Sequence, residues 1–141
     1  MVLGIGVDIV EVGRIRHAVE RYGGRFVRRI FTQGEADYCR RGARPAERFA
    51  ARFAAKEAAM KALGVGWRKG IRFVDVEVRN NELGAPGVVF TGRALELSRE
   101  LGVERIHVSL SHHRNLAIAQ VLLEGAADGH QGRPPDPGPA E

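Results

Sequence analysis

The chain has 141 residues, which is enough for one compact domain with its own core and too few for two ordinary domains. Hydrophobic residues make up 44% of it and charged residues 28%, a composition that excludes an intrinsically disordered protein and a coiled coil. The 22 basic residues outnumber the 17 acidic ones, and the net charge of +5 predicts an anionic partner: a nucleic acid, a phosphate-bearing cofactor or an acidic protein.

The first segment of the chain predicts a strand. Apolar residues alternate over residues 2–12, the pattern of a strand with one buried face. We expect the buried face to carry Leu3, Ile5, Val7 and Ile9. Asp8 then lies on the opposite face, together with Gly4 and Gly6.

Helices are predicted next. Residues 13–22 have the apolar period of a short, arginine-rich helix, and a pair of glycines separates it from a further helical turn over 25–30. The Thr-Gln-Gly-Glu run that opens residues 32–39 matches a capping box and predicts a third helix. A proline opens the strongest helix of the sequence, residues 45–64, and a glycine ends it.

The second half of the chain is mostly strands. In chain order, we expect a strand over 74–78, a turn over 80–84, a strand over 87–91, a helix over 94–101, a strand over 106–111, a turn over 112–115 and a buried strand over 116–123. Helices and strands in mixed order, joined by tight antiparallel turns, predict an α+β fold.

The last residues differ from the rest. Residues 125–141 are rich in Pro and Gly and have almost no large apolar side chains, so their burial cannot compensate for the entropy of ordering them. We therefore expect one folded domain over residues 1–124 and a disordered tail over 125–141. No apolar run approaches the roughly 20 residues that span a bilayer. The N-terminus has no signal-peptide pattern, and we expect a cytoplasmic protein without a membrane partner.

Asp8 is the first candidate for chemistry. It is a carboxylate in an otherwise apolar strand, on the face where Gly4 and Gly6 supply no side chain. A glycine within a strand often marks the close approach of a ligand or of another backbone. Taken alone, however, such an Asp is more often a hydrogen-bonded structural acid than a metal ligand.

The long helix holds the second candidate. Ala50, Phe53, Ala54, Glu57 and Lys61 share one face, so Glu57 interrupts a stripe that should pack into the core. A carboxylate there must be paired, hydrogen-bonded or bound to a metal. The simplest alternative is an ordinary ion pair between Glu57 and Lys61, one turn apart.

Two further polar groups have simple alternatives as well. Arg48, Arg52 and Lys56 form a basic row at spacing four, which by default is the solvent-exposed side of an amphipathic helix. Ser111 and His112 lie where a strand gives way to a loop, a suitable place to hold a phosphate, although a hairpin turn also favours polar residues. The sequence contains no nucleophile elbow, Walker loop or Rossmann fingerprint.

Taken together, these segments resemble the holo-acyl-carrier-protein synthases, the short phosphopantetheinyl transferases. The resemblance covers roughly residues 1–123 and rests on GIGVDIVEVGRI, RFAARFAAKEAAMKALG and HVSLSHHRNLAIAQV, with NELGAPGVVF as a fourth match. It implies a 4′-phosphopantetheinyl transferase-like α+β fold, with an antiparallel sheet packed on a long helix. It also implies transfer of 4′-phosphopantetheine from coenzyme A to a serine of an apo acyl carrier protein, with release of adenosine 3′,5′-bisphosphate.

The resemblance assigns roles to residues. It implies that Asp8 and Glu57 hold Mg²⁺ on the pyrophosphate of coenzyme A. Two carboxylates together with substrate phosphates suit Mg²⁺, a hard cation that keeps several of its waters. With Lys61, which would reach a phosphate oxygen, they form the catalytic set. Glu57 is the candidate proton acceptor, directly or through a metal-bound water. The implied coenzyme-binding residues are Arg52, Lys56, Lys61, Ser111 and His112.

Partners and assembly follow from the same resemblance. Carrier proteins are acidic, so we expect a basic docking face with an apolar anchor. It comprises Arg14, Arg21, Arg25, Phe26 and Arg28. The resemblance also implies a homotrimer with its sites at subunit interfaces. Two details depart from the family pattern: Ala85 stands where Lys is common, and a glycine is inserted between Arg21 and Arg25.

Two other functions fit the charge. A basic module that binds RNA or DNA without catalysis accounts for the net charge, but it leaves Glu57 unexplained and lacks the interleaved aromatics of a single-strand platform. A trimer that has lost activity and serves as a scaffold is the other alternative. We favour the transferase, with coenzyme A and a carrier protein as partners and no nucleic acid.

Overall fold

A computed structural model describes residues 1–64 and 70–127 of the chain. Its elements are β1 (Val2–Glu11), α1 (Val12–Tyr22), α2 (Gly24–Ile30), α3 (Gln33–Arg41), α4 (Pro45–Leu63), the 3₁₀ turn η2 (Phe73–Asp75), β2 (Val76–Asn80), β3 (Pro86–Phe90), α5 (Gly92–Leu101), β4 (Arg105–His113) and β5 (Leu116–Glu124). The α+β prediction is confirmed. Most of the tail predicted to be disordered, from residue 128 onward, lies outside the described residues.

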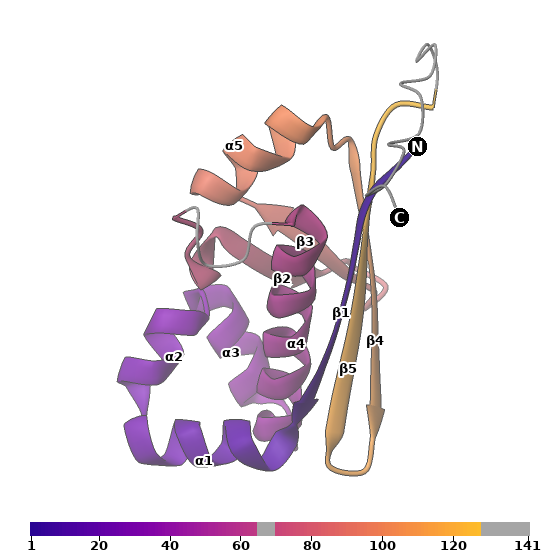
Figure 1. Ribbon diagram of the computed structural model, residues 1–141. Coiled ribbons are helices and arrows are strands. Elements are labelled where there is room, and N and C mark those ends of the chain that lie inside the picture. The colour runs from indigo at the N-terminus through magenta and orange to yellow at the C-terminus, as the bar shows by residue number, and fades with distance from the viewer. Residues whose placement is uncertain (65–69, 128–141) are drawn as a thin grey trace, which may run out of the picture.

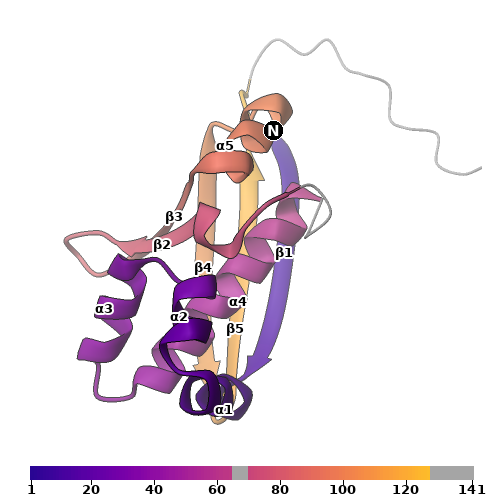
Figure 2. The ribbon, with the colours of Figure 1, turned by 90° about the vertical axis from the view of Figure 1, so that its left-hand side faces the viewer.

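Two antiparallel sheets organise the fold. One has three strands in the order β1-β5-β4, and the other is the hairpin of β2 and β3. Helix α4 lies against the three-stranded sheet, and α1, α2 and α3 lie on the far side of α4 (Figures 1 and 2). All helices therefore lie on one side of this sheet (Figure 1). None of them, within the described part of the chain, is long and apolar enough to cross a bilayer.

Small residues bring β1 and α4 into close contact. A Cβ added to Gly4 would lie 2.0 Å from the carbonyl oxygen of Ala62, and one added to Gly6 would lie 1.9 Å from that of Ala58. The sequence left two explanations for these strand glycines, a ligand or another backbone. The structure shows the backbone of α4 at both positions.

The prediction of which face of β1 is buried was wrong. Ile5, Val7 and Ile9 are 58%, 53% and 60% exposed, whereas Gly6 and Val10 are buried. The physical reason is the close packing above, because only the glycine-bearing face lets α4 approach. Asp8 belongs to that inner face, and an apolar surface is left on the outside of the sheet.

The prediction that the basic row on α4 is exposed to solvent was also wrong. Arg52 is 4% exposed and Lys56 is 0% exposed. The Lys56 ammonium lies 2.6 Å from a carboxylate oxygen of Glu35 and donates to the carbonyl oxygens of Phe73 and Val76. Burial lowers the pKa of Lys56, and the Glu35 charge partly opposes that shift. Three elements thus meet around one buried ammonium group.

Glu35 is held as firmly as its partner. It is the third residue of α3 and closes the predicted capping box: Glu35 N–H donates to the Thr32 hydroxyl at 3.2 Å, and Thr32 N–H donates to the Glu35 carboxylate at 2.9 Å. The other carboxylate oxygen accepts from Val78 N–H at 2.9 Å. The pair of Glu35 and Lys56 therefore joins α3, α4 and β2.

Most boundaries in the second half differ from the prediction by one or two residues. Val74 falls in η2, and the strand begins only at Val76, because Asp75 caps this turn through Arg72 N–H at 3.1 Å. The strand β4 continues through His113, so the turn expected over 112–115 is shorter.

Candidate active site

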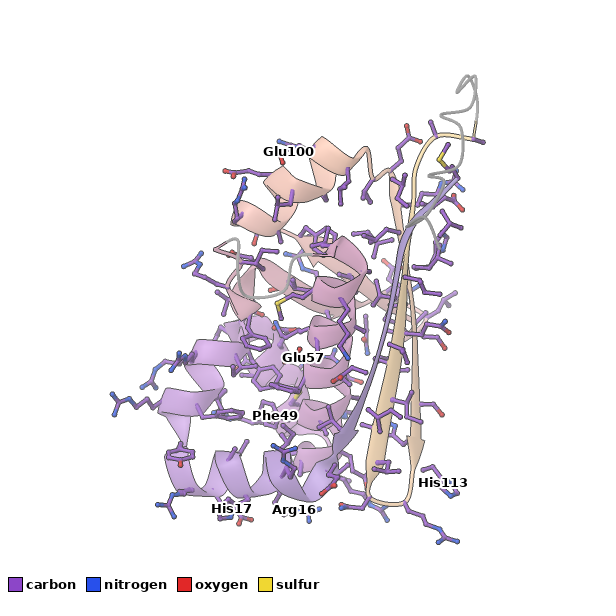
Figure 3. The ribbon with its side chains drawn as sticks, in the orientation of Figure 1. Arg16, His17, Phe49, Glu57, Glu100 and His113 are labelled. Carbon is purple, nitrogen blue, oxygen red and sulfur yellow. The ribbon has the colours of Figure 1, made fainter. Side chains whose placement is uncertain are left out.

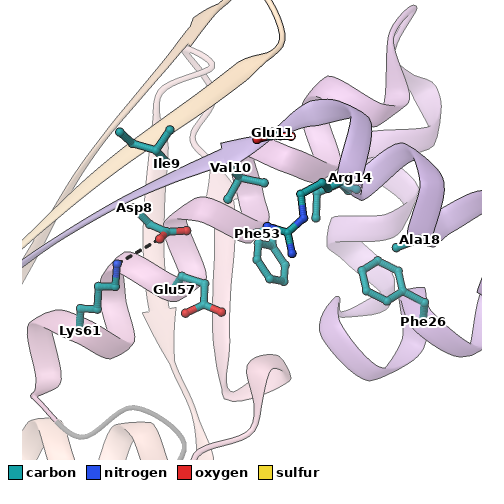
Figure 4. Close-up of a pocket in the computed structure, with 11 residues that line it drawn as sticks. Asp8, Ile9, Val10, Glu11, Arg14, Ala18, Phe26, Phe53, Glu57 and Lys61 are labelled. Carbon is teal, nitrogen blue, oxygen red and sulfur yellow. Dashed lines mark hydrogen bonds and ion pairs between the residues drawn. The ribbon is translucent and has the colours of Figure 1, made fainter.

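The inner face of β1 leads into a cavity of about 520 Å³ beside α1, α2 and α4 (Figure 4). Its charged and aromatic lining residues are Asp8, Glu11, Arg14, Phe26, Phe53, Glu57 and Lys61. The structure thus brings together the three residues predicted to be catalytic, which come from segments about fifty residues apart. Figure 3 shows Glu57 near the middle of α4.

Lys61 contacts Asp8 in this cavity. Its ammonium lies 3.1 Å from a carboxylate oxygen of Asp8 and donates to the carbonyl oxygen of Val7 at 3.0 Å. The Lys61 side chain is 54% exposed, so its charge remains accessible to a ligand. Among the described residues Lys61 has no ion pair with Glu57, and the simple pair one turn apart is not what the structure shows.

Glu57 is the unbalanced charge of the cavity. Desolvation raises its pKa, the negative charge of Asp8 raises it further, and Lys61 lowers it only in part. No cation lies within ion-pair distance of its carboxylate in the part of the chain that the structure describes. A carboxylate that is partly buried beside another acid gains from a bound cation.

The donor set suits magnesium. Residues 1–64 and 70–127 contain no group of three or more His, Cys, Asp or Glu side chains arranged to hold a metal ion. Asp8 and Glu57 are therefore a pair, and Mg²⁺ is commonly held by one or two carboxylates together with substrate phosphates and water. These residues fit such an ion, provided that a phosphate ligand completes its shell.

The predicted docking residues lie on α1 and α2, and two of them line the same cavity. Arg14 and Phe26 line it, and Phe26 packs edge-on against Phe31 with ring centroids 6.4 Å apart. The other three docking residues, Arg21, Arg25 and Arg28, are exposed on α1 and α2. Arg14 and Phe26 therefore share a cavity with Asp8 and Glu57.

A second cavity, of about 310 Å³, lies at the β4 edge of the sheet. Its polar lining residues include Tyr38, Arg48, Arg52, Asn80, Ser109 and His112. No carboxylate lines it within the described ranges. It therefore brings together two of the predicted coenzyme-binding residues, Arg52 and His112, in a cationic setting.

The structure separates the other coenzyme-binding candidates from this cavity. Lys56 is fully buried against Glu35, so its prediction as a phosphate contact is contradicted by the packing. Ser111 neighbours His112 in β4, and successive side chains of a strand point to opposite faces. Ser111 pairs with Ile118 and is not among the lining residues of the second cavity, so its contact with coenzyme A stays a prediction.

Sequence reasoning missed some lining residues. Glu11 lines the first cavity at the junction of β1 and α1, and its position three residues after Asp8 was the available signal. Tyr38 and Asn80 line the second cavity through the packing of α3 and the β2–β3 hairpin against α4. No spacing in one sequence reports such a packing.

Comparison with known proteins defines the class. The model of the 4′-phosphopantetheinyl transferase superfamily matches residues 4–121, so the chain belongs to this superfamily. Its relatives point to one family within it. Holo-[acyl-carrier-protein] synthases from Koribacter versatilis and Solibacter usitatus are 51% and 49% identical over 124 residues, which is 88% of this chain and 99% of each relative.

Solved structures agree with the sequences. The holo-[acyl-carrier-protein] synthase of Neisseria meningitidis superposes with a TM-score of 0.79 at 35% identity, over 88% of this chain and 99% of that chain. The enzyme of Helicobacter pylori, solved in complex with coenzyme A, gives a TM-score of 0.75 at 31% identity, over 85% and 99% of the two chains. The predicted fold and the predicted family are therefore confirmed.

Proposed function

We propose that this chain is a holo-acyl-carrier-protein synthase, which transfers 4′-phosphopantetheine from coenzyme A to a serine of an apo acyl carrier protein. The observation that carries the proposal is the convergence of Asp8 and Glu57 in one cavity, with Lys61 between the strand and the helix. The alternative of a nucleic-acid-binding module gives this pair of acids no role, and the relatives do not support it.

The first cavity supplies the reacting end of the site. Asp8 and Glu57 would hold Mg²⁺, which supplies neutralisation of charge on the pyrophosphate when it is bound. Lys61 has an exposed ammonium beside Asp8 and would contact a phosphate oxygen. The serine oxygen forms a bond to the phosphorus on the pantetheine side, and the bond from that phosphorus to adenosine 3′,5′-bisphosphate breaks.

Glu57 is the candidate acceptor of the serine proton. Its carboxylate lines the cavity in which the serine would be placed, so it would accept the proton directly or through a metal-bound water. The adenosine bisphosphate that leaves carries the electron pair of the broken bond, so no co-reactant is needed.

The second cavity suits the anionic remainder of coenzyme A. Arg48, Arg52 and His112 line it without a carboxylate among the described residues. Arginine is well suited to phosphate because its planar fork donates two parallel hydrogen bonds. We assign the 3′-phosphate of the adenosine to this cavity, because the 5′-phosphate belongs to the pyrophosphate at the first cavity, and we leave Lys56 out of the site.

The separation of the two cavities supports a homotrimer. The acids belong to the β1 side of the sheet and His112 to β4, the opposite edge in the order β1-β5-β4. A ring of copies in head-to-tail contact would place the β1 edge of one subunit beside the β4 edge of the next. The exposed Ile5, Val7 and Ile9 offer the apolar surface for that contact.

The carrier protein would dock on α1 and α2. The four arginines of the predicted docking face are exposed on these two helices, and one of them, Arg14, lines the first cavity together with the half-buried Phe26. An acidic protein complements that charge.

The proposal is tested by mass spectrometry of the carrier. Purified protein, coenzyme A, MgCl₂ and an apo acyl carrier protein are incubated, and the carrier should gain about 340 Da, the mass of the transferred group in a metal-assisted displacement. Chelation of the metal should stop the gain. A folded protein that modifies none of several apo carriers would contradict the proposal.

The trimer has its own test. Val7→Asp places a charge in the exposed apolar patch, so light scattering should show monomers in place of trimers and the transfer should be lost. A wild-type protein that is monomeric and active would contradict this part alone.

A further inference from the structure

Tyr38 lies between two guanidinium groups. The guanidinium carbon of Arg48 is 4.1 Å from the centroid of its ring, and that of Arg52 is 3.8 Å from the same centroid. Both guanidinium groups therefore contact the same aromatic ring, which α3 supplies, and both come from α4.

This arrangement holds together two charges that repel. Arg48 and Arg52 are one turn apart, and like charges at this spacing destabilise a helix. Neither has a carboxylate within ion-pair distance in the described part of the chain. The ring faces of Tyr38 are the compensating partner, since a guanidinium is attracted to the negative face of an aromatic ring.

The remaining contacts fix the two arginines without neutralising them. Arg48 donates to the carbonyl oxygen of Tyr38 itself at 2.8 Å, and Arg52 donates to the side-chain oxygen of Asn80 at 3.2 Å. The Nε of Arg52 is buried and has no hydrogen-bond partner within the described ranges. A buried charged donor that lacks a partner is costly unless a ligand supplies one.

We propose that Tyr38 is a positioning residue for coenzyme A. Its ring holds the guanidinium groups of Arg48 and Arg52 at a fixed separation beside the cavity at the β4 edge, so that the pair binds a phosphate of the adenosine end. The inference rests on the proposed function, because that function supplies the ligand. Tyr38 itself does not touch the reacting atoms.

Preorganisation is the physical advantage of the clamp. Free arginine side chains lose rotamer entropy when they bind an anion, and a side chain that is already held loses less. The effect should therefore appear in the affinity for the nucleotide and not in the rate of the chemical step. It should also depend on the electrons of the ring rather than on the tyrosine hydroxyl.

A substitution series at position 38 tests this. Tyr38→Phe keeps the ring and should bind adenosine 3′,5′-bisphosphate within about twofold of wild type by calorimetry, whereas Tyr38→Leu should bind about tenfold more weakly. In the transfer assay Tyr38→Leu should raise KM for coenzyme A by a similar factor and leave kcat nearly unchanged. Tyr22→Leu, at the exposed end of α1, is the matched control for nucleotide binding.

Fluorinated phenylalanines separate positioning from folding. One, two or three ring fluorines weaken the negative face of the ring while its shape is nearly kept, so the affinity should fall stepwise with each fluorine. An affinity that is equal across the series and in Tyr38→Leu would overturn the role of Tyr38. A wild-type protein that binds no nucleotide would instead contradict the proposed function.

Discussion

Helix α4 carries charge on two sides, and the two sides are built differently. Toward β1, Glu57 faces the cavity beside Asp8, with Lys61 as the single neighbouring ammonium. Toward α3 and β2, Lys56 is fully buried and is compensated by Glu35 and two carbonyl oxygens. The residues at positions 56 and 57 are adjacent in sequence and have opposite environments.

The contrast indicates which charges serve the fold and which serve a ligand. The protein itself satisfies Lys56, and a buried ion whose partners are internal is expensive to disturb. Glu57, in contrast, has a raised pKa because it is partly buried beside the acid Asp8. Carboxylates with raised pKa values are common at ligand-binding and catalytic sites. The predictions below test this division.

The largest effect should come from Lys56→Met. Removal of the ammonium leaves the buried Glu35 carboxylate without its ion-pair partner, which should lower the free energy of unfolding by about 3–5 kcal/mol. Urea denaturation followed by circular dichroism measures it. Lys61→Met on the same helix is the matched control, and its more exposed pair should contribute about 0–1 kcal/mol. Equal losses in the two variants would contradict the division.

Asp8→Asn and Glu57→Gln should affect the other side of α4. Each variant removes one carboxylate of the candidate metal site, and we expect the transfer rate to fall by about 10²–10³-fold, as when one electrostatic group is removed from an active site. Initial rates of mass gain on the carrier protein measure it. Glu100→Gln, an exposed acid on α5 (Figure 3), should keep the wild-type rate. Near-normal rates in either site variant would exclude the proposed metal pair.

The sequence predicted most of the first cavity and little of the second. Asp8 and Glu57 stood out because each is a charge that interrupts an apolar pattern, which is visible in one sequence. The family resemblance then assigned their roles and added Lys61. The burial of Lys56 could not be predicted in the same way. Its partner Glu35 lies on α3, and the sequence pattern of α4 does not show where α3 packs. Tyr38 was missed for the same reason.

The error on β1 has a separate origin. Alternation predicts two faces but not which one is buried, and the larger side chains Ile5, Val7 and Ile9 favoured the wrong choice. Small residues on both partners determine the answer, because Gly6 allows the backbone of α4 to approach. An exposed apolar face of this kind is unfavourable in an isolated subunit, and it is typical of a surface that contacts another protein.

Gly6→Ala tests the contact on which the position of Asp8 depends. The added Cβ would lie 1.9 Å from the carbonyl oxygen of Ala58, so β1 and α4 must separate. We expect a loss of about 1–3 kcal/mol in the free energy of unfolding, the range for overpacking, together with a reduced transfer rate. Gly102→Ala, at a position where nothing lies within 4 Å of the added Cβ but φ is positive, is the control for backbone strain alone. A Gly6→Ala protein with wild-type stability would mean that the strand packs less tightly than the structure shows.

The smallest effect concerns the stability of the metal-free protein. Burial and Asp8 raise the pKa of Glu57 in the folded state, so the stability that this carboxyl contributes is fully present below its ordinary value of 4.5 and is lost as the pH rises through the raised pKa. Glu57→Gln removes that loss, and it should raise Tm at pH 7 by about 1–3 °C, with no gain near pH 4. Addition of Mg²⁺ with adenosine 3′,5′-bisphosphate should then stabilise the wild type more than the variant. A variant less stable than wild type at pH 7 would show that Glu57 serves the fold after all.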